Sequence, residues 1–265
     1  MYIMDIFQRF RKNTFKMCHE YPQYWDMVLD RKQKGGGLPK KIQITSGNEA
    51  YSFVYERDDT IDFYMMYDSK NTDKCIMILI DSELKIAIVE SLNGDKQNCP
   101  NGSKLLKASI KFLKNNKDKL GVNKVVLKDN SLKHCFGKTI NFGDMYMLLN
   151  GVTWYMSYGF LPYDANKDTK NKLLIKTAYN NKNIIDKILV KDVVNLKKYI
   201  TKYAFKGFNI KKIDEMKNDK LTAYLKWILK SYDEDSCTLF YNIYDKIMFD
   251  LGIHSLHGKP FYMNL

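Results

Sequence analysis

The sequence contains no uninterrupted run of about 18 apolar residues, which is the length that a membrane-spanning helix requires. It has no internal repeat, no low-complexity run and no CxxC pair. Its first residues lack an apolar stretch followed by a small-residue cleavage site, so we expect no signal peptide. What remains is 265 residues with 45% hydrophobic and 14% aromatic side chains, which is typical of a globular protein of one large or two modest domains.

Cysteine and histidine are also few. The five cysteines are odd in number and widely scattered, at positions 18, 75, 99, 135 and 237. This pattern predicts structural thiols in a reduced, cytoplasmic compartment rather than a disulfide framework. His254 and His257 form an HxxH pair without a third ligand nearby in the sequence, so we expect no metal site.

The formal net charge of +13 raises the question of nucleic-acid binding. The excess is evenly spread, with 9 basic against 5 acidic residues in 1–50, 19 against 15 in 51–180, and 15 against 10 in 181–265. Nearly all of it is lysine beside many Asn, Ile and Tyr, a mix typical of AT-rich genomes such as those of protists and large DNA viruses. A solvated lysine surface is therefore our main interpretation, and an anionic ligand or nucleic acid is the alternative.

Hydrophobic patterning divides the chain into an N-terminal helical segment (1–37), an α/β core (38–180) and a helical C-terminal extension (181–265). Short β-branched and aromatic runs with brief gaps predict sequentially antiparallel strands in the core, because such gaps are too short for crossovers. The fold class that follows is α+β, with a mostly antiparallel twisted sheet and flanking helices. The strands are expected at 41–45, 50–56, 61–67, 75–81, 85–92, 123–130 and 172–179.

Helical spacing predicts a helix over 102–121, with an apolar stripe opposite a lysine face and Gly121 as its stop. A second helix is predicted over 143–160, with Asp144 as its N-cap, after a loop at 131–142. Amphipathic helices are predicted in the last third, among them 184–200 and 236–252.

The stretch from the strand at 85–92 to the helix at 102–121 is polar and rich in Asn and Gly. Backbone N–H groups at a helix N-terminus lack internal partners and favour anions. Gly102 permits close approach of a ligand, while Ser103 and Lys104 add donors. An ordinary capped loop explains the same residues, so this stretch alone leaves both readings open.

The order of these segments resembles the core of the GNAT (N-acetyltransferase) superfamily. The order is the hairpin strands, the Gly-containing loop, the lysine- and leucine-rich helix, the strand VVLKDN and the segment TWYMSYGFLPYD. The likeness covers roughly residues 60–180, and it identifies the chain as a divergent member. The family often carries aliphatic-Tyr-x-x-x-Gly-Phe, matched here at 154–160. Its pyrophosphate loop, Q/R-x-x-G-x-G/A, is matched less well, because Gln97 stands five residues before Gly102 and Pro100 removes an amide.

The resemblance implies a transferase that moves an acetyl group from acetyl-CoA to an amine of a protein or small molecule. Tyr155 would protonate the leaving thiolate and Glu90 would act as general base. The thioester would lie where the strand KIAIVES splays at a bulge from KVVLKDN. The cofactor-binding residues implied are Val89, Ser91, Asn98, Asn101, Gly102, Ser103, Lys104 and Asn130.

Two alternatives remain open from the sequence. The irregular pyrophosphate loop favours a non-catalytic GNAT-like scaffold, with the C-terminal helices as the surface for a protein partner. The net charge favours a basic nucleic-acid-binding protein, although no continuous basic groove can be read from the pattern. Neither alternative involves a membrane.

Overall fold

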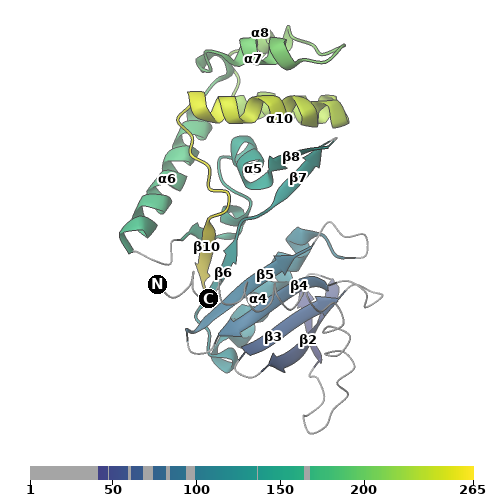
Figure 1. Cartoon of the computed structure of the whole chain (residues 1–265), viewed down its shortest axis with the longest axis vertical. Helices are drawn as coiled ribbons and strands as arrows, with labels where there is room; N and C mark the ends of the chain where they lie inside the picture. Colours follow the sequence, from purple (N-terminus) through teal and green to yellow (C-terminus); the bar gives the residue numbers. More distant parts are fainter. Residues whose placement is uncertain are drawn as a thin grey trace. The chain divides into compact units, whose positions relative to one another are not determined.

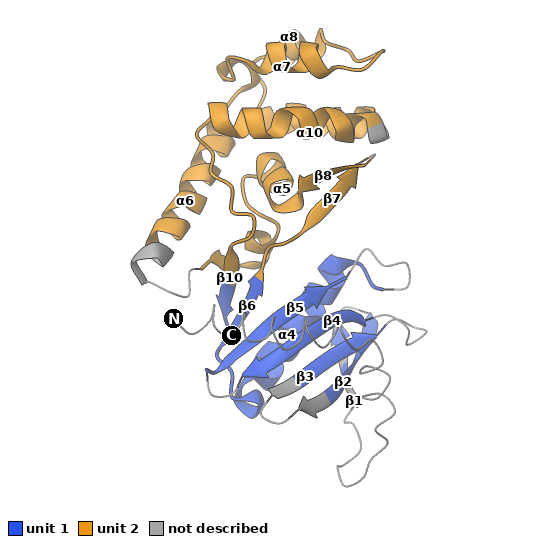
Figure 2. Cartoon of the chain, viewed as in Figure 1, with its two compact units in different colours: residues 1–127, 165–167, 262–265 blue, residues 128–164, 168–261 orange. Residues whose placement is uncertain are grey.

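The computed structural model describes residues 41–46, 48–58, 61–67, 74–81, 84–93, 99–135, 137–163 and 168–265. The N-terminal helical segment predicted at 1–37 lies outside these residues. The fold is α+β, as predicted, with a mostly antiparallel mixed sheet and a helical C-terminal region. The chain forms two compact units (Figures 1 and 2): unit 1 is residues 1–127, 165–167 and 262–265, and unit 2 is residues 128–164 and 168–261. The main division between the two units falls after residue 127.

Unit 1 is built on a meander of consecutive strands. The strands are β1 (Lys41–Ser46), β2 (Glu49–Asp58), β3 (Ile61–Tyr67), β4 (Lys74–Asp81) and β5 (Ile86–Leu92). Each pairs antiparallel with the next, so the predicted strands and their sequential pairing are confirmed.

A helical crossover then changes the direction of pairing. Helix α4 (Gly102–Leu120) joins β5 to β6 (Lys124–Lys128), and the two strands run parallel, with register from Ile86↔Lys124 to Val89↔Leu127. Gly121 ends α4 at φ 67°, in the left-handed region that glycine adopts without strain, as predicted. Parallel neighbours require such a crossover, which the short gaps earlier in the chain could not supply.

The core of unit 1 lies between α4 and one face of the sheet. The apolar side of α4 is buried, with Leu105, Leu106, Phe112 and Leu113 at 1% exposure or less. The Phe112 ring stacks on Phe53 of β2, with centroids 5.3 Å apart, and meets Tyr64 of β3 at 5.0 Å. The lysines of α4 face solvent, which confirms the amphipathic pattern.

Residues 262–265 complete unit 1. They comprise the end of β10 (Pro260–Asn264), which is the neighbour of β6 in the sheet, and the residue that follows it. The Leu265 N–H donates to the Asn123 carbonyl at 2.9 Å, and Lys124 lies over the Tyr262 ring, 5.2 Å from its centroid. Unit 1 is therefore assembled from segments far apart in the sequence.

Unit 2 begins with a segment that the sequence analysis read differently. The expected loop at 131–142 contains a hairpin of β7 (Leu132–Cys135) and β8 (Lys138–Asn141), with Gly137 at φ 71° in its turn. The expected helix at 143–160 is two pieces, α5 (Phe142–Asn150) and the 3-10 helix η2 (Tyr155–Tyr158). Gly151, at φ 79°, ends α5, and the Gly151 N–H donates to the Met147 carbonyl at 2.7 Å.

The expected strand at 172–179 is wrong, because these residues lie in α6 (Asp168–Lys187). The buried positions of that helix are Ala178, Asn181 and Ile185, a spacing of three and four residues that belongs to a helix. Leu173, at 62% exposure, lies outside this buried stripe. The window of eight residues was too short to separate a strand from a helix.

The rest of unit 2 is mainly helical and packs around one large apolar cluster that includes Tyr224, Phe240 and Ile247. Its elements are β9 (Leu161–Pro162), η3 (Val190–Asp192), α7 (Leu196–Tyr203), α8 (Lys212–Glu215), α9 (Leu221–Ser231) and α10 (Asp233–Asp250). The predicted helix at 236–252 is confirmed as α10, whereas 184–200 is interrupted by η3 between α6 and α7. The start of β10 meets the end of β9, where the Tyr163 N–H donates to the Pro260 carbonyl at 2.8 Å.

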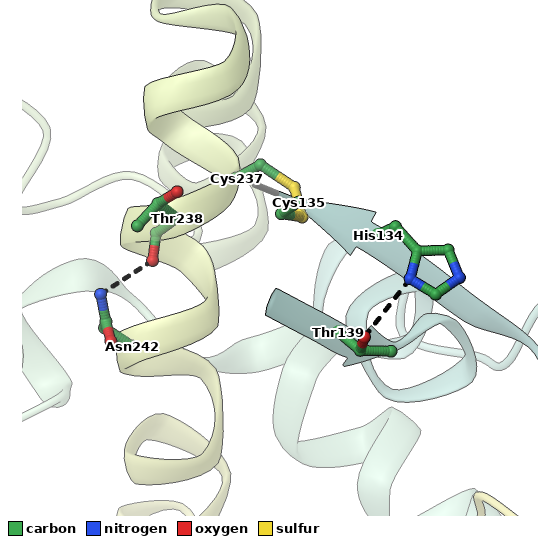
Figure 3. The surroundings of a disulfide bond; sticks show 6 residues. All are labelled: His134, Cys135, Thr139, Cys237, Thr238 and Asn242. Carbon is green, nitrogen blue, oxygen red and sulfur yellow. Dashed lines mark hydrogen bonds between the residues drawn. A yellow bond between two sulfur atoms is a disulfide. The ribbon is translucent and has the colours of Figure 1, made fainter. Parts of the chain in front are cut away.

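Four of the five cysteines form disulfides, contrary to the expectation of free thiols. Cys75 of β4 is bonded to Cys99, and Cys135 at the end of β7 is bonded to Cys237 of α10 (Figure 3). Their separations of 24 and 102 residues carry no motif that the sequence could reveal. The two disulfides do not support the expected cytoplasmic location. Within the described ranges, no helix is both long and apolar enough to cross a membrane.

Replacing Phe112 by alanine should destabilise unit 1 by about 3–5 kcal/mol, since the change leaves a cavity between α4 and the sheet. Urea denaturation followed by circular dichroism measures this loss. The matched variant Lys111→Ala, on the exposed side of the same helix, should stay within about 0.5 kcal/mol of the parent. A Phe112→Ala loss below about 1 kcal/mol would show that this packing does not hold α4 to the sheet.

Candidate functional site

The first group of predicted site residues lies in unit 1, at the C-terminal end of β5 and the start of α4. We call Val89, Glu90, Ser91 and residues 101–104 the fork site. The pairing of β5 with β6 ends at Val89↔Leu127, while β5 itself continues to Leu92. The carboxyl ends of parallel strands, followed by a helix N-terminus, are a common place for a ligand in α/β units.

Glu90 occupies a special backbone position within this site. The register between β4 and β5 pairs Met77 with Ser91 and Ile78 with Val89, which makes Glu90 the extra residue of a β-bulge. Residues 86–89 of β5 are all buried, whereas Glu90 is exposed. A bulge turns a side chain out of the regular alternation, so the acidic group projects from the strand at the point where the pairing with β6 ends.

The start of α4 is capped by its own chain. The Asn101 side chain accepts a hydrogen bond from the Ser103 N–H at 2.8 Å, and the Asn101 carbonyl accepts from the N–H groups of Lys104 and Leu105 at 2.9 and 3.0 Å. An anion at this helix end therefore uses the Gly102 N–H or displaces the Asn101 side chain from Ser103. The first turn contains no acidic residue that would oppose an anion.

Lys104 has an acidic neighbour from β2. Its ammonium donates to Glu49 at 2.5 Å, and the Tyr51 hydroxyl donates to the same carboxylate at 2.5 Å. The hydrogen bond from Lys104, followed by that from Tyr51, lowers the pKa of Glu49. Burial, and then the bond to Glu49, raises the pKa of Tyr51 to about 12. Glu49 therefore stays ionised and competes with any other anion for the lysine.

The remaining predicted residues are not part of this group. Asn98 lies outside the described residues, and Asn130 and Tyr155 belong to unit 2. Tyr155 is 7% exposed and packs edge-to-face on Trp154 and Phe160, with centroids 4.9 and 6.2 Å away. Burial, together with the charge of Asp129, raises the pKa of its phenol. A raised pKa makes the phenol a weaker acid and suits a core aromatic better than a proton donor.

Unit 2 holds a second polar group that the sequence analysis missed. The acid–histidine cluster consists of Asp129, Asp144, Ser255 and His257. The Ser255 hydroxyl donates to Asp144, whose two carboxylate oxygens lie 2.9 and 2.7 Å away. The backbone N–H of His257 donates to the Ser255 hydroxyl at 3.1 Å. Asp144 is thus a buried acceptor rather than the predicted helix N-cap, which is Asn141. The members come from three separate parts of the sequence, so no local motif could reveal them.

Asp129 is the most confined member of this cluster. It is 0% exposed, and its Oδ1 accepts from the Ser131 N–H and hydroxyl at 3.2 and 2.5 Å. Its Oδ2 is buried without a hydrogen-bond partner among the described residues and faces Gly143, where an added Cβ would lie 2.3 Å away. Burial raises the pKa of Asp129 and of Asp144, although Ser131 and Ser255, respectively, oppose the effect.

The described residues of the acid–histidine cluster match neither a serine–histidine nucleophile nor a metal site. Ser255 donates to Asp144, and His257 contacts the Ser255 hydroxyl through its backbone N–H rather than through its ring, so the described residues contain no serine–histidine pair here. Within the described residues, no three His, Cys, Asp or Glu side chains are grouped to hold a metal ion.

Comparison of the chain with protein-family models, curated proteins and solved structures finds no match.

Asp129→Asn should make the stability of the protein less dependent on pH. Because burial raises the folded pKa of Asp129, the folded state keeps a proton that the unfolded chain loses near pH 3.9. The free energy of unfolding from this group is therefore greatest below that pH and falls as pH rises towards the folded pKa. Urea titrations between pH 3.5 and 7 should show this fall in the parent and a flatter curve in Asp129→Asn.

The matched control is Asp219→Asn, the same change at an exposed carboxylate of unit 2. It removes one carboxylate by the same substitution at a solvent-exposed position, and the pH slope of the parent should be retained. Parallel curves for the parent and Asp129→Asn would contradict the raised pKa. The comparison also leaves Asp144 and His257, the titratable neighbours of Asp129, unchanged in every sample.

Proposed function

We propose that the chain is a GNAT-like N-acyltransferase that binds acetyl-CoA at the fork site and transfers the acetyl group to an amine. The single observation that carries the proposal is the bulge that turns Glu90 outward where the pairing of β5 with β6 ends. The resemblance of the sequence to the GNAT core supports a thioester site in this region. The antiparallel meander followed by the parallel unit of β5, α4 and β6 supports the same reading.

The residues present fit the cofactor in part. The Gly102 and Ser103 amides and the Lys104 ammonium are donors at the N-terminus of α4, where the helix dipole favours a pyrophosphate. Strand amides near Val89 and Ser91 would orient the extended arm of coenzyme A. When bound, the cofactor supplies an activated acyl group as a thioester. The ion pair of Lys104 with Glu49 is the feature that fits least well, because it has to open or share the lysine.

Glu90 has the role of general base in this proposal. An amine nucleophile is protonated at neutral pH, and its lone pair has to be freed before it attacks a carbonyl carbon. The exposed Glu90 carboxylate accepts that proton directly or through one water. Tyr155 is left out of the mechanism, since its phenol is buried in the aromatic core of unit 2 and its pKa is raised.

A scaffold or binding function is the second candidate, favoured by two observations. Asn101 and Glu49 already satisfy several of the donors on which an anion would depend. In unit 2, Val194 and Phe249 are 89% and 85% exposed. Asn195, next to Val194, donates to Asp250, next to Phe249, at 3.1 Å, which places both apolar side chains on the surface near α7 and α10. Such a surface fits a protein partner better than it fits nucleic acid.

Acetyl-CoA should raise the melting temperature by a few degrees at about a hundredfold excess over its dissociation constant, equivalent to about 2.7 kcal/mol of stabilisation. Glu90→Gln should retain that shift and lose about 10²- to 10⁴-fold in acetyl transfer. Thiol release from acetyl-CoA, with spermidine and lysine peptides as acceptor probes, measures the transfer. A parent protein without any shift would favour the scaffold function, and a Glu90→Gln variant with full turnover would remove Glu90 as base.

Glu49→Gln should tighten binding of coenzyme A, whereas Lys104→Gln should weaken it. The first change removes the carboxylate that competes for Lys104, and the second removes the ammonium itself. Both groups are about half exposed, so each effect should be roughly twofold to fivefold. Isothermal titration calorimetry at low ionic strength measures both, with Lys107→Gln, at an exposed position one turn further along α4, as the control that changes only net charge. Equal affinities for all four proteins would place the pyrophosphate elsewhere.

A further inference from the structure

The disulfide between Cys75 and Cys99 lies directly beside the fork site. Cys99 stands two residues before Asn101, the N-cap of α4, and Cys75 is the second residue of β4. Their Cα atoms are 5.4 Å apart. The bond therefore ties the chain that enters α4 to the sheet, immediately before the helix turn that carries Gly102, Ser103 and Lys104.

The same part of β4 also holds the end of β5. The Asn93 N–H donates to the Cys75 carbonyl, and the Asn93 side-chain amide donates to the Lys74 carbonyl, both at 2.8 Å. The connection from β5 to α4 is thus attached to the start of β4 on both sides, by hydrogen bonds at Asn93 and by the disulfide at Cys99. Opening the disulfide leaves the first attachment intact and releases only the side next to α4.

Helix α4 itself does not depend on this bond. Its buried residues Leu105, Phe112 and Leu113 fix it to the sheet whether or not the disulfide is present. Residues 99–101 have no comparable apolar anchor, because Cys99 and Pro100 are only partly buried and Asn101 is exposed. Reduction should consequently loosen the entrance to the first turn of α4 while the unit remains folded.

We propose that the Cys75–Cys99 disulfide is a redox control on cofactor affinity: the oxidised protein binds acetyl-CoA tightly and the reduced protein binds it weakly. This inference rests on the proposed function, since it concerns the same fork site. The oxidised bond holds the entrance to α4 in place before the cofactor arrives. The reduced protein has to order these residues on binding, which costs affinity.

Reduction takes place by thiol–disulfide exchange with a dithiol, which is the only reactant required. A thiolate of the dithiol attacks the partly buried Cys99 sulfur, the bond to Cys75 breaks, and Cys75 leaves as a thiolate that takes a proton. The second thiol of the dithiol then displaces Cys99 as a thiolate, which is also protonated. Two electrons pass to the protein, which gains two thiols, and the dithiol becomes a disulfide.

The experiment measures the affinity of the full chain for acetyl-CoA by isothermal titration calorimetry, in air-oxidised protein and after dithiothreitol. Peptide mapping by mass spectrometry establishes the state of each disulfide. The parent should bind at least about tenfold more weakly after reduction, because ordering each released backbone residue costs on the order of a factor of ten in affinity. Cys99→Ser, which retains the buried Cys75 as a thiol, should bind weakly in both conditions. Cys237→Ser, which lacks only the other disulfide, should behave like the parent.

The possible failures are distinguishable. Equal affinity before and after the Cys75–Cys99 bond is shown to open would overturn the inference and leave the proposed function standing. Loss of reductant sensitivity in Cys237→Ser would transfer the effect to the disulfide of unit 2 and also overturn it. Absence of acetyl-CoA binding in every sample would overturn the proposed function, and the inference with it.

Discussion

The packing of α4 against the sheet is the interaction on which the fork site depends. Parallel strands cannot be joined by a tight turn, so β5 and β6 become neighbours only if the chain between them crosses one face of the sheet. Helix α4 makes that crossing because its apolar side is buried on Phe53 and Tyr64. Its N-terminus is thereby fixed next to the carboxyl end of β5, and the bulge at Glu90 gains its position from the same arrangement.

Local sequence patterns were sufficient for the part of the fold built by neighbours in the chain. The meander from β1 to β5 was predictable because alternating β-branched and aromatic residues were separated by short polar turns. Helix α4 was predictable because its apolar stripe indicates a helix and Gly121 marks where that helix ends. The strand expected at 172–179 failed because Leu173, Leu174 and Ile175 form a compact apolar run, and only the spacing to Ala178 and Ile185 shows that it is helical.

The features that could not be predicted come from contacts between distant residues. Glu49 meets Lys104 across 55 positions, and Asp144 meets Ser255 across 111. The two disulfides likewise join cysteines without a motif. That the end of β5 and the start of α4 lie near each other was foreseeable from the order of elements. Their electrostatic surroundings were not, because pairing across strands decides which lysine already has a carboxylate beside it.

The acid–histidine cluster and the fork site illustrate two uses of carboxylates. Asp129 and Asp144 are enclosed, and burial favours their neutral forms. Glu49 and Glu90 lie on the surface of unit 1, where the charged form is solvated and able to exchange partners. Chemistry in which a carboxylate accepts a proton from a substrate fits the second pair better, while the first pair belongs to the internal packing of unit 2.

The return of residues 262–265 to unit 1 bears on how the chain acquires its structure during synthesis. The edge of β6 that pairs with β10 stays open until the ribosome has made all of unit 2. An unpaired strand edge is a template for wrong pairing with other chains. The nascent protein therefore carries an exposed edge while unit 2 is being made, and the speed with which the helices of unit 2 fold limits how long that edge persists.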